Sequence, residues 1–497
     1  MKGLGKLAQS AGLVFVGTVF GQALGLVGEL LIIRSVTPTT LGYLGVTYAL
    51  VSTVGTIGLL GVPSGVTRFL SADKGNKGGT LLAGYLIGLG SAITLACGLF
   101  VTRFRIADVV GEPLISNLLP LFLPYLLALP VARITFSALR ADQRTVSATV
   151  SKWIAPRLIA LAILGVFLKL FNTPLVGAIG YWVSIPVLAS LCALWFVKDN
   201  VPTMTVPTRQ ELRSLWRFSW PLAVGASLSM LLTRLDILML SMYVESAAVG
   251  HYRSVQPLRQ ITTFVTGAFG FLFLPLATQY YETGDFDGLN RLYRTSTKWI
   301  VSLSLPFVLV FALFPRDVIR VFFGAKYLPA SLALSILIAG LFFRALVGLD
   351  TDLLKALDRT RIELGCAIVG VVGNVIMNIL LIPPFGIAGA AAATVSGFFI
   401  YNICEVAIIY KTVGTHPFGV NNLKPLLPTV LMSGAIATVV DSQLGLIELV
   451  AVGIVFSTFH LGSLIGTRSF DENDTVLIEH VEEKLGVDLS GVREFLM

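Results

Sequence analysis

VGAIGYWVS, at Val176–Ser184, is similar to AGAAAATVS at Ala388–Ser396, roughly 210 residues further along the chain: both have Gly-Ala at the second and third positions and end in Val-Ser. Gly42, in Leu41-Gly42-Tyr43, and Gly250, in Val249-Gly250-His251-Tyr252, recur at a similar offset. Repetition over this length within an apolar chain indicates one multi-helix unit that is used twice. The sequence therefore predicts two six-helix repeats followed by a further pair of helices.

The composition places this repeat in a membrane. The 497 residues are 55% apolar and 13% charged, and the mean hydropathy is +0.83. Soluble domains carry about 25% charged residues, so a soluble globular protein is excluded. Apolar runs of about 20 residues, each sufficient to cross a hydrocarbon core of about 30 Å, follow one another with short polar joints. We predict an all-α integral membrane protein of about 14 transmembrane helices.

The distribution of charge and proline predicts the domain organisation and the orientation. We expect an N-lobe at residues 1–197, a cytoplasmic linker at 198–217, a C-lobe at 218–410, a helix pair at 411–466 and a cytoplasmic amphipathic tail at 467–497. Lys and Arg gather in alternate joints, which predicts that both termini are cytoplasmic. Topology thereby explains most of the net charge of +8 without nucleic-acid binding. Repeats of six helices share one orientation, so the substrate path is expected between the two lobes.

Small residues and cysteines have mainly structural interpretations. Gly17, Gly21 and Gly25 recur every four residues, a spacing that lets another helix approach the first span closely. All four cysteines lie inside predicted spans, so we predict no disulfide framework and no metal site. No Gly-x-x-x-x-Gly-Lys-Ser/Thr loop is present, and the four histidines are scattered. We therefore predict no cofactor and no enzymatic activity.

Ionisable residues inside the predicted spans are the candidate functional residues. Each costs about 2.5 to 3.5 kcal/mol to insert, so such residues persist mainly where they face a bundle interior or a cavity. The candidates are Glu29, Arg133, Arg157, Arg234, Asp236, Arg344 and Glu405. Acids recur in the first and seventh spans, and arginines recur in the fourth and tenth. Two alternatives remain open: Arg133 and Arg344 lie near helix ends, from which long stems can reach water, and Arg34 ends its helix.

The arginine surplus favours an anionic substrate. Arg234 lies deep in its span, and Asp236 is two residues further on, a spacing that does not place both on one helical face. Its partner must be another carboxylate, such as Glu29, or the substrate itself. Guanidinium binds phosphate through paired donors and stays charged in apolar surroundings, so a lipid phosphate or pyrophosphate head group fits. We predict substrate binding by Arg234, Arg34, Glu29, Asp236, Arg157, Arg133 and Arg344, with Glu29, Asp236 and Glu405 as candidates for ion coupling.

Three longer stretches carry a family resemblance. They are LGYLGVTYALVSTVGTIGLLGVPSGVTRFLS at Leu41–Ser71, DTDLLKALDRTR at Asp350–Arg361 and VGNVIMNILLIPPFGIAGAAAATVSGFFIYNI at Val372–Ile403. In this order they resemble the polysaccharide-transporter (Wzx-type flippase) branch of the multidrug/oligosaccharidyl-lipid/polysaccharide exporter superfamily. The resemblance covers nearly the whole chain.

The resemblance implies a fourteen-helix fold, alternating access and flipping of a lipid-linked sugar from the cytoplasmic to the outer face of the plasma membrane. It also implies a cleft lined by the first, second, seventh and eighth helices, which favours Glu29, Arg34, Arg234 and Asp236 as cavity residues. The partners would be a lipid-linked glycan, membrane lipids and glycan assembly enzymes. Two alternatives remain: an ion-coupled multidrug exporter of the same superfamily, and a non-transporting scaffold of a glycan assembly complex.

Overall fold

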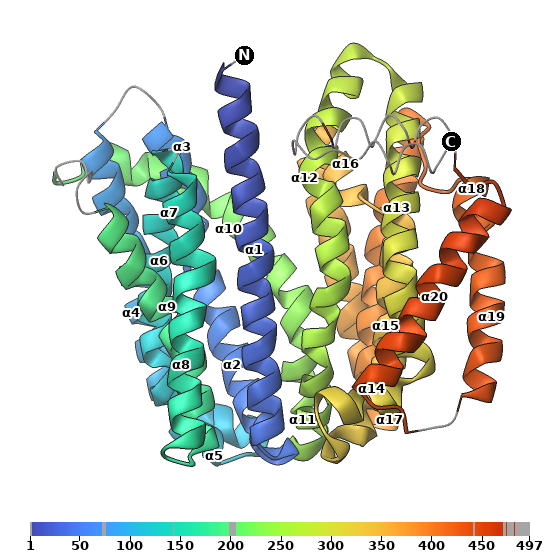
Figure 1. The fold of residues 1–497 in the computed structure, drawn as a ribbon. Coiled ribbons are helices and arrows are strands. Elements are labelled where there is room, and N and C mark those ends of the chain that lie inside the picture. The colour runs from blue at the N-terminus through green and yellow to red at the C-terminus, as the bar shows by residue number, and fades with distance from the viewer. Residues whose placement is uncertain are drawn as a thin grey trace. The chain divides into compact units, whose positions relative to one another are not determined.

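The computed structural model describes residues 2–71, 76–142, 144–197, 205–440, 443–470, 474 and 482. Within these ranges the regular structure is helical and no strand occurs (Figure 1). The amphipathic helix predicted in the tail lies almost entirely outside the described residues, as does the first part of the predicted linker.

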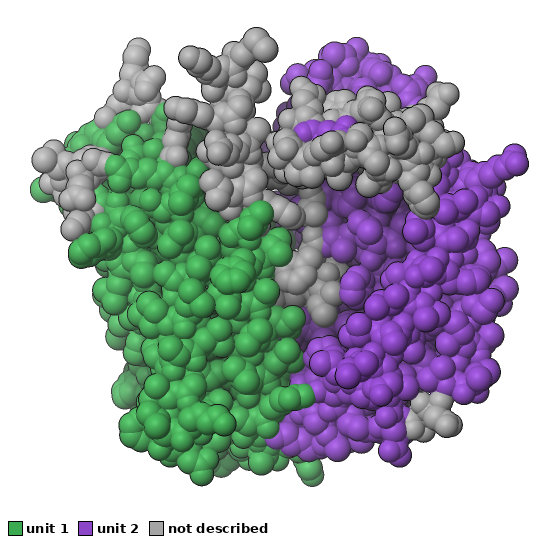
Figure 2. All heavy atoms as spheres, viewed as in Figure 1, with its two compact units in different colours: residues 1–253 green, residues 254–497 purple. Residues whose placement is uncertain are grey.

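The chain forms two compact units, residues 1–253 and residues 254–497 (Figure 2). Unit 1 contains α1 (Lys2–Ser35), α2 (Pro38–Gly58), α3 (Val62–Ser71), α4 (Lys77–Val110), α5 (Leu114–Leu118), α6 (Leu123–Ala141), α7 (Thr145–Thr149), α8 (Ala155–Lys169), α9 (Pro174–Val197), α10 (Arg209–Leu240) and most of α11 (Ser246–Val255). Unit 2 contains α12 (Arg259–Thr283), α13 (Phe286–Leu313), α14 (Pro315–Phe322), α15 (Ser331–Val347), α16 (Asp350–Ala356), α17 (Thr360–Val413), α18 (Val420–Leu423), α19 (Leu426–Val439) and α20 (Leu446–Gly466).

The prediction of an all-α membrane protein is confirmed. Among the described residues, 10 helices are long and apolar enough to cross a bilayer. One of them, α17, joins two predicted spans across Gly386, whose φ of 54° and ψ of −126° interrupt the helical backbone. The count of about 14 spans predicted from apolar run length is consistent with this arrangement.

The compact units divide at a different point from the predicted lobes, because α10 packs within unit 1 against α2, α3 and α4. Gly65 on α3 allows this approach, since a Cβ there would overlap side chains of α10. Helix α10 also begins inside the predicted linker. Thr208 and Glu211 form a capping box, in which the Glu211 N–H donates to Thr208 Oγ1 over 3.2 Å and the Thr208 N–H donates to Glu211 Oε2 over 2.7 Å. The lobe boundaries read from the repeat remain a prediction.

The close helix packing predicted from the glycine spacing of α1 occurs in the structure, against Trp153 and Arg157. A Cβ on Gly21 would overlap the carbonyl and side chain of Trp153, and a Cβ on Gly25 would lie 3.2 Å from Arg157 Nε. Helix α1 therefore runs along α8 within unit 1 (Figure 1). This packing brings Glu29, one turn beyond Gly25, into the interior of unit 1.

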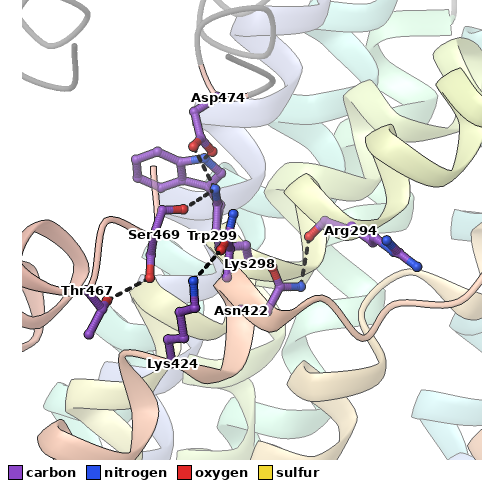
Figure 3. Close-up of polar contacts among 9 residues, drawn as sticks. Arg294, Lys298, Trp299, Asn422, Lys424, Thr467, Ser469 and Asp474 are labelled. Carbon is purple, nitrogen blue, oxygen red and sulfur yellow. Dashed lines mark hydrogen bonds and ion pairs between the residues drawn. The ribbon is translucent and has the colours of Figure 1, made fainter. Parts of the chain in front are cut away.

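A buried ion pair fastens the segment after α20 to α13 in unit 2 (Figure 3). Lys298 Nζ lies 2.6 Å from Asp474 Oδ2 and donates to the Ser469 carbonyl over 3.0 Å. The Trp299 indole N–H donates to the other carboxylate oxygen of Asp474 over 2.9 Å. Both carboxylate oxygens are therefore satisfied, although Asp474 is only 1% exposed.

Asp474→Asn is expected to release this segment without unfolding the helices. Removing one charge of a buried pair costs about 3 to 5 kcal/mol when the other charge stays buried. Here the pair joins the segment after α20 to α13, so its loss should separate that segment from Lys298 and stay local. Limited proteolysis should therefore cut the variant after α20 at least tenfold faster, while its thermal midpoint shifts little. Asn473→Ala, at the preceding residue, is the control. If the Asp474→Asn variant and wild type were cut at equal rates, the ion pair would not hold this segment to α13.

Candidate functional site

Glu29 forms the charged centre of unit 1 with Arg253 of α11. Arg253 Nη2 donates to Glu29 Oε2 over 2.8 Å, and the Trp182 indole N–H of α9 donates to Glu29 Oε1 over 2.9 Å. The side chains of Arg253 and Glu29 are 4% and 15% exposed, so the pair is shielded from water. Gly45 of α2 leaves room for the arginine stem, because a Cβ there would lie 3.1 Å from Arg253 Cγ. Each carboxylate oxygen of Glu29 thus has its own donor.

Arg253 also retains a donor that nothing in the described chain accepts. Its Nε atom is buried and has no hydrogen-bond partner among the described residues. Its guanidinium lies 5.7 Å from the centroid of the Trp182 ring. A buried guanidinium N–H without an acceptor costs free energy until an oxygen reaches it. Arg253 therefore has the chemistry to receive an anionic oxygen in addition to Glu29.

Arg234 of α10 lies over an aromatic cluster rather than beside a carboxylate. Its guanidinium carbon is 5.2 Å from the centroid of the Tyr48 ring. Tyr48 stacks on Trp182 at 4.9 Å with an interplanar angle of 16°, and it meets Tyr125 edge-on at 5.8 Å. Within the described residues Arg234 forms no ion pair. Sequence analysis left two partners open for Arg234, a carboxylate such as Glu29 or the substrate. Since Glu29 is already paired with Arg253, the structure favours the substrate.

Arg157 has a structural role that its sequence position did not reveal. Pro156 has no N–H, and the backbone of Val150–Ile154 before it forms a short π-helix. Arg157 Nη1 donates to the carbonyls of Lys152 and Trp153 over 3.0 and 3.2 Å. Its guanidinium also lies 4.7 Å from the Trp153 ring centroid. Arg157 thus satisfies carbonyls that the interrupted helix leaves free, and its guanidinium stays beside the Trp153 ring.

Asp236 lies in unit 1 but serves as a fixed acceptor. It is 1% exposed, its Oδ2 accepts from the Tyr252 hydroxyl over 2.6 Å, and its Oδ1 accepts from the Ile237 N–H over 2.8 Å. Tyr252 directly precedes Arg253. Asp236 therefore holds α11 against α10 and orients the arginine that pairs with Glu29.

The remaining predicted residues lie at different places. Arg133 on α6 and Arg34 at the end of α1 are exposed, and Arg133 acts electrostatically on Tyr125 and Arg157. Arg344 and Glu405 belong to unit 2, where the Arg344 guanidinium lies 5.9 Å from the Phe398 ring centroid. Unit 1 thus contains Glu29, Arg34, Arg133, Arg157, Arg234 and Asp236. Their roles in binding or ion coupling remain proposals.

Sequence reasoning missed Arg253 and the aromatic cluster. Arg253 lies in a polar joint outside the predicted spans, so it is not among the ionisable residues within spans. One signal was available: Arg253 follows the repeat glycine Gly250 by three residues, which places both on one side of a helix. Tyr48 and Trp182 gave no comparable signal, since aromatic residues inside apolar spans are usually part of the core.

Unit 2 contains an apolar cavity of about 320 Å³ between α13, α14 and α20. It is lined by Pro306, Phe307, Val310, Phe311, Val318, Phe322, Leu446, Leu449, Val450, Gly453, Ile454 and Ser457. Ser457 carries the one side-chain hydroxyl in this lining, and that hydroxyl donates to the Gly453 carbonyl over 2.7 Å. The cavity therefore presents hydrocarbon surface and suits an apolar chain.

Comparison with known proteins gives a family for this architecture. The family model described as polysaccharide biosynthesis protein matches residues 7–279, and the MatE model matches residues 221–397. The probable low-salt glycan biosynthesis flippase Agl15 of Haloferax volcanii is 23% identical over 402 residues, which cover 80% of this chain and 82% of that protein. The uncharacterized membrane protein MJ1068 of Methanocaldococcus jannaschii is 29% identical over 255 residues, half of each chain.

Among solved structures, the lipid II flippase MurJ in an inward closed conformation superposes with a TM-score of 0.72 at 16% sequence identity. The superposition covers 90% of this chain and 97% of MurJ. At this identity the similarity concerns the fold. Since the first family model spans more than half of the sequence, the chain belongs to the polysaccharide biosynthesis protein family, within the multidrug/oligosaccharidyl-lipid/polysaccharide exporter superfamily.

Proposed function

We propose that this multi-pass membrane protein flips a lipid-linked sugar or oligosaccharide from the cytoplasmic to the outer face of the plasma membrane by alternating access. The carrier would be a polyprenyl or dolichyl phosphate or pyrophosphate, and the product would serve surface glycan or glycoprotein synthesis. Both termini would be cytoplasmic, as the distribution of Lys and Arg favours. The names of Agl15 and MurJ as flippases support a transporter rather than a catalytic enzyme.

One observation carries the proposal: Glu29 of α1, the carboxylate considered as the partner of Arg234, is already paired with Arg253. Among the described residues Arg234 is left on the Tyr48 ring without a carboxylate, and Arg253 keeps a free Nε donor. Guanidinium groups in such surroundings bind phosphate oxygens through charge-assisted hydrogen bonds. A phosphorylated head group supplies those oxygens.

The apolar cavity of unit 2 supports a lipid carrier. Ligand cavities commonly have volumes of about 300 to 1,000 Å³, and this one is lined almost entirely by aliphatic and aromatic side chains. An isoprenoid chain can pack its methyl and methylene groups against this surface through van der Waals contacts, as it does against the acyl chains of a bilayer. A free, water-soluble sugar phosphate would gain nothing from such a surface.

An ion-coupled multidrug exporter is the competing function, and the MatE match at residues 221–397 favours it. An exporter of organic cations needs a carboxylate that is available to the drug. Glu29 is occupied by two donors in the structure, and the aromatic cluster carries arginine. The charge of unit 1 therefore favours the anionic substrate.

Arg234→Ala is expected to lower flipping of a fluorescent phosphate-linked isoprenoid sugar in proteoliposomes by about 10- to 150-fold, because a hydrogen bond to a charged group contributes about 1.5 to 3 kcal/mol. Arg234→Lys keeps the charge but loses the paired donors, so it should recover only part of the rate. Arg103→Ala is the matched control, since Arg103 also lies over an aromatic ring, 4.0 Å from the Phe100 centroid. Normal flipping by Arg234→Ala would refute this role. Identifying the glycan lipid that accumulates when the protein is removed would name the substrate.

A further inference from the structure

Two of the four cysteines lie in contact within α17, although they are 38 positions apart. Cys366 belongs to the part of α17 before the break at Gly386, and Cys404 belongs to the part after it. The Cys366 thiol donates to Cys404 Sγ over 3.0 Å. Since the sulfur atoms of a disulfide are about 2.0 Å apart, a movement of about 1 Å would bring this pair to bonding distance.

Close packing between the two parts of α17 keeps the thiols together. A Cβ on Gly370, one turn after Cys366, would lie 2.9 Å from Tyr401 Cβ. A Cβ on Gly397 would lie 2.8 Å from Asn374 Cβ. As the residue number rises on the first part it falls on the second, so the two parts run antiparallel. Helices whose backbones approach this closely have little freedom to separate, and the two thiols therefore stay opposite each other.

The two thiols differ in exposure. Cys366 is 1% exposed, whereas Cys404 is half-buried and therefore accessible to a small oxidant. Oxidation of Cys404 is the slow step, because the thiolate is the reactive form of a thiol and apolar surroundings disfavour a charge. The second step is fast, since Cys366 already touches the sulfur that it must attack and the reaction is intramolecular.

We propose that Cys366 and Cys404 are a site of reversible oxidation, at which a hydroperoxide converts the two thiols into a disulfide across the break at Gly386. Cys404 Sγ attacks one oxygen of the hydroperoxide, the O–O bond breaks, and Cys404 becomes a sulfenic acid while water or an alcohol leaves. Cys366 Sγ then attacks Cys404 Sγ, the S–O bond breaks, and the hydroxyl leaves as water with the Cys366 proton. The two thiols lose two hydrogens and two electrons, and the hydroperoxide is reduced.

The disulfide is tested on the full-length protein in lipid, treated with hydrogen peroxide and then with an alkylating agent that blocks the remaining thiols. Cyanogen bromide cleaves after methionine, and Met377 lies between the two cysteines. The fragments 243–377 and 378–432 contain one cysteine each, Cys366 and Cys404. After peroxide treatment they should migrate as one band that dithiothreitol separates, while the uncleaved protein stays monomeric without reductant. Fragments that stay separate, or that are joined only in a dimer, would overturn the proposal.

The variant Cys97→Ser/Cys192→Ser excludes an indirect route. It removes the two cysteines outside the pair and leaves α17 unchanged. The joined band should form in this variant at the wild-type rate. Loss of the band would overturn the proposal, because the disulfide would then arise by exchange with another cysteine rather than from the pair itself.

Gly370→Ala tests the contact with both cysteines retained. Its methyl group would press on Tyr401 and separate the two parts of α17 beside the thiols, so the joined band should form about threefold more slowly, or slower still. Gly365→Ala is the matched control and should form the band at the wild-type rate. Gly365 directly precedes Cys366, and among the described residues no atom lies within 4 Å of its added Cβ. Equal rates in the two variants would overturn the assignment of the reaction to the packed contact.

Discussion

Glu29→Gln is expected to lower the stability of unit 1 by about 3 to 5 kcal/mol, because it leaves a guanidinium buried without its counter-charge. The Arg253 side chain is 4% exposed, so it cannot exchange the lost carboxylate for water without moving α11. Arg253→Gln should cost a similar amount, since Glu29 would keep only the Trp182 indole N–H. Thermal unfolding of the purified protein in detergent measures both effects.

The double variant Glu29→Gln/Arg253→Gln separates stability from function. Each single variant leaves one buried charge without its partner, whereas the double variant leaves none. The double variant should therefore be more stable than either single variant. Additive losses, within about 0.5 kcal/mol, would show that the two residues do not interact and would contradict the pair. Trp182→Phe is the graded control. It removes one neutral donor to Glu29 and should cost about 1 kcal/mol.

Flipping should remain impaired in the stabilised double variant. If the free Nε of Arg253 receives a phosphate oxygen, its loss removes about 1.5 to 3 kcal/mol of substrate binding, which corresponds to about 10- to 150-fold in rate. A double variant that is both stable and fully active would assign Arg253 a structural role alone. The same proteoliposome assay that tests Arg234 measures this outcome.

The fold could be predicted because its signals are local and physical. Apolar run length fixes where spans lie, and the four-residue glycine spacing of α1 identifies the face that packs closely. The high cost of inserting a charge also made Glu29 and Arg234 candidates for a functional role, which remains a prediction. These inferences needed no knowledge of which helices are neighbours.

The pairing of charges could not be predicted, because it depends on which helices meet. Glu29 and Arg253 are 224 positions apart, and nothing local to either residue encodes the contact. Arg157 shows the converse limit: its donors satisfy carbonyls freed by Pro156, a role that depends on the backbone of Val150–Ile154. Asp350, the first residue of α16, is 3% exposed; its burial could not be predicted because it follows a predicted span, at a position where an acid is ordinarily solvated.

Gly42→Ala and Gly250→Ala are each expected to destabilise the crossing of α2 and α11 by about 3 kcal/mol, at the upper end of overpacking effects. A Cβ on Gly42 would overlap the carbonyl of Ser246, and a Cβ on Gly250 would overlap the carbonyl of Pro38. Each glycine thus meets the residue four positions before the other, so the repeat-related glycines form one symmetric contact. The obstructing atoms belong to the backbone and cannot rotate away, and the helices themselves must separate.

That symmetry makes the two substitutions strongly non-additive. Once α2 and α11 have moved apart to admit one methyl group, space exists for the second, so Gly42→Ala/Gly250→Ala should cost little more than either single variant. Gly98→Ala on α4 is the matched control: no atom lies within 4 Å of its added Cβ, and alanine should stabilise the exposed helix by up to about 1 kcal/mol. Thermal unfolding of wild type and of these four variants measures the effects. If the losses at Gly42 and Gly250 were fully additive, the two glycines would occupy independent contacts rather than one crossing.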